Sequence, residues 1–249
     1  ITAMYDAAYF LQFATGGAKR LSYAASFGKT NFDAATTRVY QQMLASYDKI
    51  TVREDSAVQM LESWGAKNCY GQVLDPTLLL SADEWIDLLV YEEMQIKYAS
   101  QKYILVYQIH NDRQLSSYAL RLAAHTGLKL LRVNPFMHQV HRGGKFVLCP
   151  DVTEFLSLIK NATYIVTDSF HGTCFSLTFE KQFIEVLPNN TTGTRNQSIL
   201  ALTGLSNRIV YDFDDFSIIN RMINYQPVRE ILAKERGRSV KMLKCLLNS

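Results

Sequence analysis

Short apolar runs rich in β-branched and aromatic residues alternate along the chain with longer segments of helical apolar periodicity. The runs that predict strands are residues 20–24, 49–53, 70–74, 103–108, 129–133, 164–167, 183–187 and 208–210. The segments that best predict helices are residues 34–46, 55–64, 113–126, 152–160 and 172–180. Such alternation is typical of βαβ units around a mainly parallel sheet. The predicted fold class is therefore α/β.

Several helix ends are also predicted. Gly65 and Gly127 each follow an expected helix, as C-cap residues do. Asp151 precedes a helix and has Glu154 three residues further on, which resembles a capping box. These signals agree with the helical periodicity around them.

The length of the chain predicts more than one lobe. Its 249 residues, 48% of them hydrophobic, allow one large domain or two of ordinary size. A boundary is expected between residues 82 and 94, where a Pro-marked segment gives way to an acidic one. We expect a first lobe over residues 1–88, a second over 89–219 and a separate tail over 220–249.

Charge and cysteine usage exclude some classes of protein. The 26 Lys and Arg residues exceed the 23 Asp and Glu residues by three, too weak a surplus for a nucleic-acid partner. The four cysteines lie far apart and are expected to be reduced, mostly buried thiols. No apolar stretch approaches the roughly 20 residues of a bilayer span, and the first residues do not form a signal peptide. The expected location is the cytoplasm.

The tail from Pro227 to Ser249 predicts a basic amphipathic helix, interrupted at Gly237. Its apolar residues recur at helical spacing, and six Lys and Arg residues stand against two Glu residues. One interpretation is a helix docked on the protein with a solvated basic face. The alternative is contact with a partner or with the inner face of a membrane.

The chemistry is expected where a strand passes into a helix. A β-branched run ends at Thr167, a polar cluster follows, and a helical apolar pattern begins at Gly172. Ligands of open α/β sheets lie beyond the carboxyl ends of strands, and helix N-termini attract anions. His171 in this turn suits charge recognition or proton transfer. Gly172 would allow the backbone to approach an anion closely. Alternatively, His171 caps its own helix.

The same turn carries a family resemblance. Thr167-Asp168-Ser169-Phe170-His171-Gly172-Thr173 resembles the signature of the polysaccharide pyruvyl transferase family. Supporting blocks follow the family's order over about residues 9–208, namely Ser22 to Gly28, Val52 to Ser56, Leu74 to Leu79 and Glu154 to Ile159.

The resemblance implies a glycosyltransferase-B-like architecture of two Rossmann-like lobes with the active site in the cleft between them. Residues 1–88 would be the remainder of an incomplete N-terminal, acceptor-side lobe, because family members carry further N-terminal sequence. The implied reaction transfers pyruvate from phosphoenolpyruvate to two sugar hydroxyls as a ketal. The implied partners are phosphoenolpyruvate and a saccharide acceptor, either a bacterial surface polysaccharide or its lipid-linked precursor. No metal or cofactor is implied.

The resemblance also assigns roles to residues. His171 would contact the donor as general acid or base. The residues implied in donor binding are Arg53, Ser169, Gly172, Thr173 and Lys181. From the residue types alone, Asp168 is expected to orient His171 or, like Ser169, to fix the turn through bonds to the backbone. Arg195 would lie at the mouth of the cleft near the acceptor.

Each of the cations also has an ordinary interpretation. Arg53 could form a salt bridge near Glu54 and Asp55, and Lys181 could be an exposed cation at a helix end. Arg195 could be a plain loop residue.

Other functions remain as alternatives. A nucleotide-sugar glycosyltransferase has the same implied fold, and a non-catalytic binding module would use the basic tail. A hydrolase triad is not predicted, because Asp168, Ser169 and His171 are nearly consecutive. His138, His141 and Cys149 are interpreted as part of a surface loop rather than a metal site.

Overall fold

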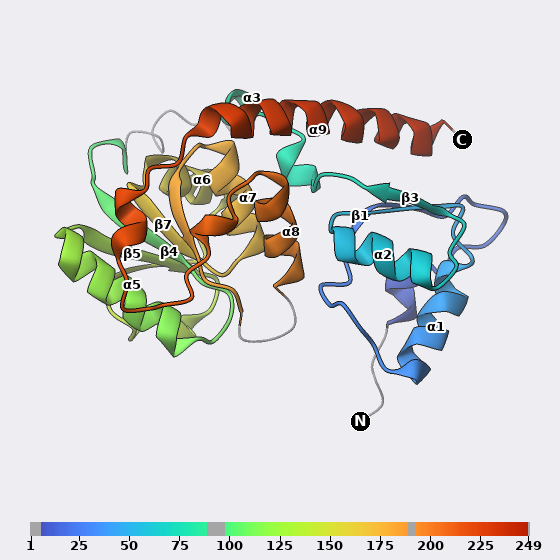
Figure 1. Cartoon of the computed structure of the whole chain (residues 1–249), viewed down its shortest axis with the longest axis horizontal. Coiled ribbons are helices and arrows are strands. Elements are labelled where there is room, and N and C mark those ends of the chain that lie inside the picture. The colour runs from blue at the N-terminus through green and yellow to red at the C-terminus, as the bar shows by residue number, and fades with distance from the viewer. Residues whose placement is uncertain (1–5, 89–97, 189–192, 249) are drawn as a thin grey trace. The chain divides into compact units, whose positions relative to one another are not determined.

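The computed structural model describes residues 6–88, 98–188 and 193–248 (Figure 1). The chain forms two compact units. Unit 1 comprises Ile1–Leu79, Thr191–Ile199 and Ala233–Ser249, and unit 2 comprises Leu80–Asn190 and Leu200–Leu232. Helices α8 (Thr194–Leu202) and α9 (Tyr225–Leu247) each contribute residues to both units. The units are therefore discontinuous in sequence, whereas three consecutive segments were expected. The expected boundary at residue 88 adjoins residues 89–97, which lie outside the described residues.

Unit 1 contains a three-stranded parallel sheet in the order β1-β2-β3. Its strands are β1 (Leu21–Ala25), β2 (Lys49–Val52) and β3 (Cys69–Gln72). Its helices are α1 (Ala34–Leu44), α2 (Asp55–Ser63) and the 3-10 turns Ala7–Phe10 and Pro76–Leu78. Ile50 and Val52 of β2 pack with Ala57 and Leu61 of α2 in the core.

Unit 2 contains a five-stranded parallel sheet in the order β6-β5-β4-β7-β8. Its strands are β4 (Tyr103–Tyr107), β5 (Lys129–Asn134), β6 (Lys145–Leu148), β7 (Tyr164–Thr167) and β8 (Gln182–Glu185). Its helices are α3 (Ala82–Leu88), α5 (Arg113–Thr126), α6 (Val152–Asn161), α7 (Phe170–Thr178) and the 3-10 turns Met137–Gln139, Ser206–Arg208 and Ser217–Asn220. Figure 1 shows α5 on one face of this sheet and α6 and α7 on the other.

The α/β class and most of the expected elements are confirmed, with the following corrections. Strand β6 was not expected, and the expected strand 208–210 amounts to a single bridge between Glu185 and Ile209. Helix α3 was also not expected, and α8 begins at Thr194, so Arg195 lies inside this helix and not in a loop before it. Helix α7 begins at Phe170 instead of Gly172. Helix α9 continues through Gly237 without interruption.

The two expected glycine ends and the Asp151 half of the expected capping box are present. Gly127 has the left-handed conformation that ends α5, and Gly65 has a positive φ after α2. The Asp151 carboxylate accepts a hydrogen bond from the Glu154 N–H at 2.7 Å and so caps α6. The Glu154 carboxylate accepts a hydrogen bond from the Tyr98 hydroxyl.

The cysteines differ in part from expectation. All four are free, but only Cys174 is buried, whereas Cys149 and Cys245 are exposed. Cys149 follows strand β6, an element absent from the expected set, so its position at a surface strand end was missed. Among the described residues, no helix combines the length and the apolar character that a membrane span requires.

Candidate active site

The turn between β7 and α7 is built on side-chain hydroxyl groups. Ser169 is the N-cap of α7, and its hydroxyl accepts a hydrogen bond from the Gly172 N–H at 3.3 Å. The Ser169 N–H donates in turn to the Thr167 hydroxyl at 3.0 Å. Thr167 donates to the carbonyl of Tyr107 at the end of neighbouring β4, at 2.7 Å. The turn is therefore fixed to two adjacent strands at the carboxyl edge of the sheet.

His171 stands out within α7. All nine residues of this helix are described, and eight of them are buried, while His171 is exposed. It is the second residue of the helix, so its imidazole lies in the first turn, where the helix dipole favours negative charge. Its ring centroid lies 5.6 Å from that of Phe170. Ser169, rather than His171, caps the helix.

Gly172 and Thr173 serve the packing of this helix. Both are buried, and a Cβ atom on Gly172 would overlap the Thr167 hydroxyl and lie 3.0 Å from Cδ1 of Tyr107. The Thr173 hydroxyl lies 3.1 Å from the Ser169 carbonyl and 2.5 Å from Oε2 of Glu185. The missing side chain of Gly172 thus permits close helix–strand contact, and the Thr173 hydroxyl is bonded to Glu185 of β8.

Lys181 is not brought to this turn. It follows the C-terminal end of α7, and its backbone N–H donates to the Ser176 carbonyl. Its ammonium group donates to the carbonyl of Lys160 at the end of α6, at 2.7 Å. Burial and the nearby Lys160 charge lower the pKa of Lys181. The helix separates Lys181 from His171, so the position implied for it in donor binding is not supported by this placement.

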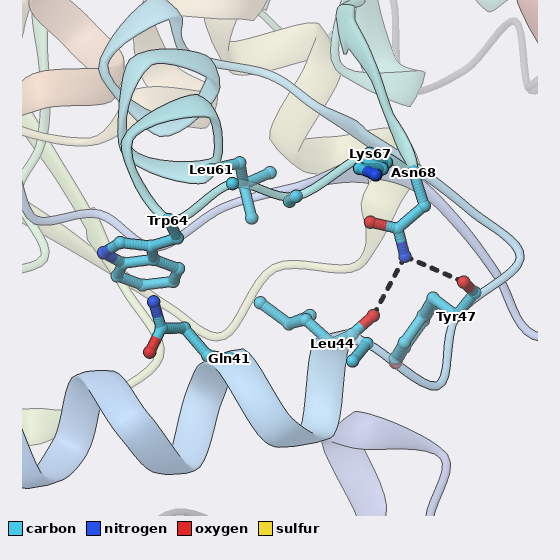
Figure 2. A pocket seen from close by; sticks show the side chains of 10 residues that line it. Gln41, Leu44, Tyr47, Leu61, Trp64, Lys67 and Asn68 are labelled. Atoms are coloured by element: carbon cyan, nitrogen blue, oxygen red, sulfur yellow. Dashed lines mark hydrogen bonds between the residues drawn. The ribbon is translucent and has the colours of Figure 1, made fainter.

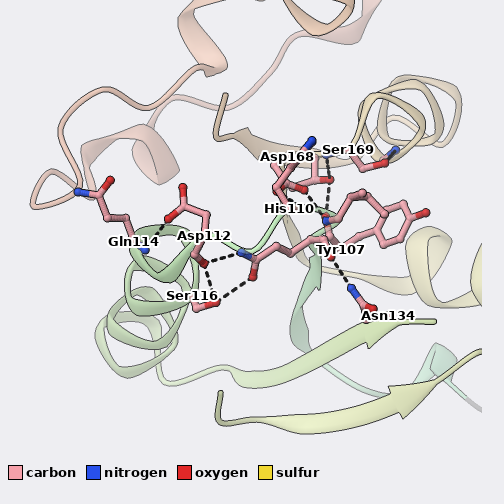
Figure 3. Close-up of polar contacts among 12 residues, drawn as sticks. Tyr107, His110, Asp112, Gln114, Ser116, Asn134, Asp168 and Ser169 are labelled. Atoms are coloured by element: carbon pink, nitrogen blue, oxygen red, sulfur yellow. Dashed lines mark hydrogen bonds and ion pairs between the residues drawn. The ribbon is translucent and has the colours of Figure 1, made fainter. Parts of the chain in front are cut away.

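Asp168 contacts a histidine that the sequence did not single out. Its Oδ1 accepts a hydrogen bond from the Ile109 N–H at 2.7 Å. Its Oδ2 accepts one from the His110 N–H at 3.0 Å and lies 3.2 Å from Nδ1 of the His110 ring (Figure 3). Asp168 was expected to fix the turn or to orient His171. It instead holds the loop after β4, because β4 and β7 are paired neighbours and end at the same edge.

The electrostatics of Asp168 follow from its burial. The carboxylate is only 1% exposed, and burial raises its pKa despite the opposing hydrogen bonds from Ile109 and His110. Burial likewise raises the pKa of the neighbouring Tyr107, against a side-chain hydrogen bond with Ser169. The His110 side chain is 32% exposed. The edge of the sheet thus carries a buried acid beside a partly exposed imidazole.

The loop that carries His110 is anchored by Gln108, which is fully buried. The Gln108 carbonyl accepts hydrogen bonds from the side-chain amides of Asn134 at 2.5 Å and Gln139 at 3.0 Å. Its side chain donates to the Asp112 carbonyl and accepts from the Ser116 hydroxyl. These four contacts leave little freedom for the loop, a condition for a precise site.

In unit 1, Arg53 follows strand β2 and forms an ion pair with Asp75 at 2.5 Å. Asp75 also accepts hydrogen bonds from the N–H and the hydroxyl of Thr77. Burial raises the pKa of Asp75, but the hydrogen bonds and the Arg53 charge outweigh it, so the pKa lies below its usual value. The salt-bridge interpretation of Arg53 is correct in kind, with Asp75 as the partner in place of Glu54 or Asp55.

Glu54 is a second residue that sequence reasoning missed. It is fully buried, and its Oε1 accepts hydrogen bonds from the Ser26 hydroxyl, the Phe27 N–H and the Gly28 N–H at 2.9, 2.9 and 3.1 Å. A Cβ atom on Gly28 would lie 3.9 Å from Nε of Arg195, which is in the first turn of α8. Arg195 therefore lies beside the loop after β1, at the carboxyl edge of this sheet.

Two of the cavities of unit 1 differ in their place relative to the sheet. One of about 300 Å³ is lined by ten residues that include Gln41, Trp64 and Asn68 (Figure 2). Asn68 precedes β3 and donates to the carbonyls of Leu44 and Tyr47, so this pocket lies near the amino ends of the strands. Another of about 580 Å³ lies over β1 and β2. Its aromatic lining residues are Tyr9, Phe10, Phe27, Phe32, Tyr40 and Tyr47.

Solved structures with the same fold are nucleotide-sugar enzymes. The UDP-GlcNAc 2-epimerase of Neisseria meningitidis has a TM-score of 0.59 at 12% identity, covering 92% of this chain and 70% of that one. The epimerase of Methanocaldococcus jannaschii has a TM-score of 0.52 at 14% identity, covering 80% and 61%. The trehalose-phosphate synthase of Burkholderia vietnamiensis has a TM-score of 0.52 at 9% identity, covering 88% and 67%. The fold is thus glycosyltransferase-B-like with Rossmann-like lobes, and the chain spans 61% of the length of the archaeal epimerase.

Sequence comparison defines the family. No curated protein matches the chain. The profile of the polysaccharide pyruvyl transferases matches residues 3–191, about three quarters of the chain, and includes the turn that holds His171. The chain therefore belongs to the polysaccharide pyruvyl transferase family.

Proposed function

We propose that this protein transfers pyruvate from phosphoenolpyruvate to two hydroxyl groups of a saccharide, with the donor bound at the N-terminal turn of α7. The observation that carries the proposal is His171. It is the one exposed residue of an otherwise buried helix, at the carboxyl edge of a parallel sheet, in a chain of this transferase family. An exposed imidazole at a helix N-terminus suits a small substrate with a phosphate and a carboxylate.

The proposed chemistry needs proton transfers and charge stabilisation. A proton adds to C3 of phosphoenolpyruvate, which makes C2 electrophilic, and a sugar hydroxyl attacks C2. The C2–O bond to phosphate then breaks with its electron pair on the phosphate, and the second hydroxyl closes the ketal. His171 would take part as acid or base, and the N-terminal turn of α7 would stabilise the charge on the leaving phosphate.

Arg53, to which the family resemblance assigns donor binding, lies in unit 1, whereas the α7 turn lies in unit 2, so Arg53 is not part of the donor site proposed at the turn. Its guanidinium has five N–H donors, and the ion pair with Asp75 fixes its orientation through NH1. Lys181 is left out of the proposal because it lies beyond the opposite end of α7. For Gly172 and Thr173 we propose no contact with the donor. Both residues position the helix that carries His171.

The acceptor side is proposed to lie in unit 1. The cavity of about 580 Å³ over β1 and β2 offers aromatic side chains together with Ser22, Ser26 and Lys29. Aromatic faces with a few polar groups are suited to a sugar ring, which has apolar C–H faces and polar edges. Arg195 lies beside the same loop, after β1.

The direct test is product formation. The protein is incubated with phosphoenolpyruvate and a set of oligosaccharides, and NMR follows phosphate release and the new methyl group of the ketal. We expect phosphate and ketal in equal amounts with the wild type and at least about 100-fold slower formation with His171→Ala. Equal rates for the two proteins would contradict the proposal.

A nucleotide sugar serves as the competing donor in the same assay. The Neisseria epimerase structure of this fold has UDP-GlcNAc bound, so a nucleotide-sugar glycosyltransferase is the alternative. Release of nucleoside diphosphate in place of phosphate would favour that alternative over pyruvyl transfer.

A further inference from the structure

Next to the proposed donor site, a second imidazole is held by a buried carboxylate. His110 follows β4 and Asp168 follows β7, and these neighbouring parallel strands pair with Tyr107 opposite Thr167. We propose that His110 is a second acid–base residue of the site, with Nε2 as the proton acceptor, and that Asp168 is its positioning residue. This inference rests on the proposed function, since it divides the proton transfers of that reaction between His110 and His171.

The contacts of Asp168 determine the expected tautomer of the His110 ring. An ionised carboxylate only accepts hydrogen bonds, so a ring nitrogen that bonds to it carries the hydrogen. Nδ1 lies 3.2 Å from Oδ2 of Asp168. The neutral ring then has its hydrogen on Nδ1 and its lone pair on Nε2.

The backbone contacts fix the position of the ring. Oδ2 of Asp168 also accepts the N–H of His110 itself, and Oδ1 accepts that of Ile109. One buried carboxylate thus holds both the ring and the chain that carries it. Nδ1 is engaged with the Asp168 carboxylate, and the His110 side chain is 32% exposed. Nε2 is then the nitrogen available to a substrate.

The balance of the reaction gives two tasks to the two histidines. Each turnover forms one C3–H bond and two C2–O bonds to the saccharide, and it breaks the C2=C3 π bond, the C2–O bond to phosphate and two O–H bonds of the saccharide. The two hydroxyl groups release two protons, of which one is matched by the proton gained at C3 and the other leaves with phosphate. His110 would accept a hydroxyl proton at Nε2, and the Asp168 carboxylate would stabilise the resulting imidazolium. His171 would deliver the proton to C3.

The site variant that isolates this role is His110→Asn. Its amide keeps an N–H group for Asp168 and removes Nε2. The matched control is His125→Asn, because His125 is an exposed histidine in the last turn of α5, the helix whose first turn follows His110. We expect His110→Asn to lower kcat by about 100-fold or more while the Kd for phosphoenolpyruvate stays within about twofold of the wild type. The control should keep the wild-type kcat.

The result that overturns the inference is a kcat within about twofold of the wild type for His110→Asn. Failure of the proposed function is a different result, in which the wild type itself neither binds phosphoenolpyruvate nor releases phosphate from it. In that case the catalytic role of His110 is overturned as well. The contact between Asp168 and the His110 ring is then tested by a separate measurement that needs no substrate.

The tautomer is measured without substrate. The chain has five histidines, and the 15N signals of His110 in histidine-labelled protein are assigned by their loss in His110→Asn. We expect the neutral form of the ring to carry its hydrogen on Nδ1, and this preference to be lost in Asp168→Asn, because an amide no longer offers two acceptor oxygens. A wild-type ring with its hydrogen on Nε2 would contradict the role of Asp168.

Discussion

Gly172 of α7 packs directly on the Thr167 hydroxyl of β7, with no room for a Cβ atom between them. The same Thr167 hydroxyl accepts a hydrogen bond from the Ser169 N–H and donates one to the Tyr107 carbonyl. The first turn of α7, which carries the exposed His171, is thus seated on two strands by a contact that only glycine permits.

Gly172→Ala is predicted to destabilise the protein, although alanine is the better helix former. The overlap with Thr167 should cost about 1–3 kcal/mol, more than the gain of up to about 1 kcal/mol in helix propensity. The control is Gly237→Ala in α9, where nothing lies within 4 Å of the added Cβ. It should raise stability by about 0.5–1 kcal/mol. Urea unfolding measures both changes, and destabilisation of equal size in the two variants would contradict the account.

Glu54→Ala is predicted to loosen the loop after β1. The change removes the acceptor of the Ser26 hydroxyl and of the Phe27 and Gly28 N–H groups, and an unsatisfied buried donor costs about 1–3 kcal/mol. Glu54→Gln keeps an acceptor oxygen and should lose less. Amide hydrogen exchange at Phe27 and Gly28 is the local readout. Unchanged protection of both amides in Glu54→Ala would refute the assigned role.

The loss of stability in Arg53→Gln is predicted to depend on pH. At neutral pH the change leaves the Asp75 carboxylate without its ion pair, which should cost about 2 kcal/mol. The pKa of Asp75 is lowered in the folded protein. Its contribution is therefore fully present above the unfolded pKa of about 3.9 and is lost as the pH falls through the lower folded value. The stability gap between wild type and variant should close in acid. If the difference in stability between wild type and Arg53→Gln does not change with pH, the ion pair with Asp75 is not the cause of that difference.

The outer face of α9 is predicted to bind anionic membranes weakly, and we propose that this places the protein at the cytoplasmic face of a membrane. Four of its exposed basic residues, Lys234, Arg238, Lys241 and Lys244, are spaced so that they share one side of the helix. Each basic residue near an anionic surface contributes about 1 kcal/mol. Lys241→Glu with Lys244→Glu should therefore weaken cosedimentation with phosphatidylserine vesicles at least about tenfold. The control exchanges the exposed Lys129 and Lys145 of unit 2 for Glu. If both double variants lose vesicle binding equally, the binding depends on the net charge of the protein and not on α9.

Local signals in the sequence predict the strands and helices with strong periodicity, and they are less reliable at helix starts. The strand ending at Thr167 and the helix of residues 113–126 are confirmed as expected. Helix α7 begins earlier than expected because Ser169 supplies the cap and Gly172 lies inside the helix. Strand β6 (Lys145–Leu148) was missed because it is an edge strand with no buried residue, so only its pairing with β5 identifies it.

The parts of the site that depend on distant contacts are not predictable from local patterns. Asp168 and His110 are 58 positions apart, and their contact exists only because β4 and β7 are neighbours in the sheet. Lys181 is ten residues from His171 in sequence, yet the intervening helix carries it to the other end of α7. The sequence did contain a signal for His110. It lies three positions after the end of β4, much as His171 lies four positions after the end of β7.

The most direct test of the donor site is a calorimetric titration of the wild type and of His171→Ala with phosphoenolpyruvate, with UDP-GlcNAc as the control ligand. The account predicts saturable binding of one phosphoenolpyruvate per wild-type chain, at least about tenfold weaker binding to the folded variant, and no tighter binding of UDP-GlcNAc. Binding of equal strength to both proteins, or a folded wild type that binds UDP-GlcNAc and not phosphoenolpyruvate, would contradict the assignment of the α7 turn as a phosphoenolpyruvate site.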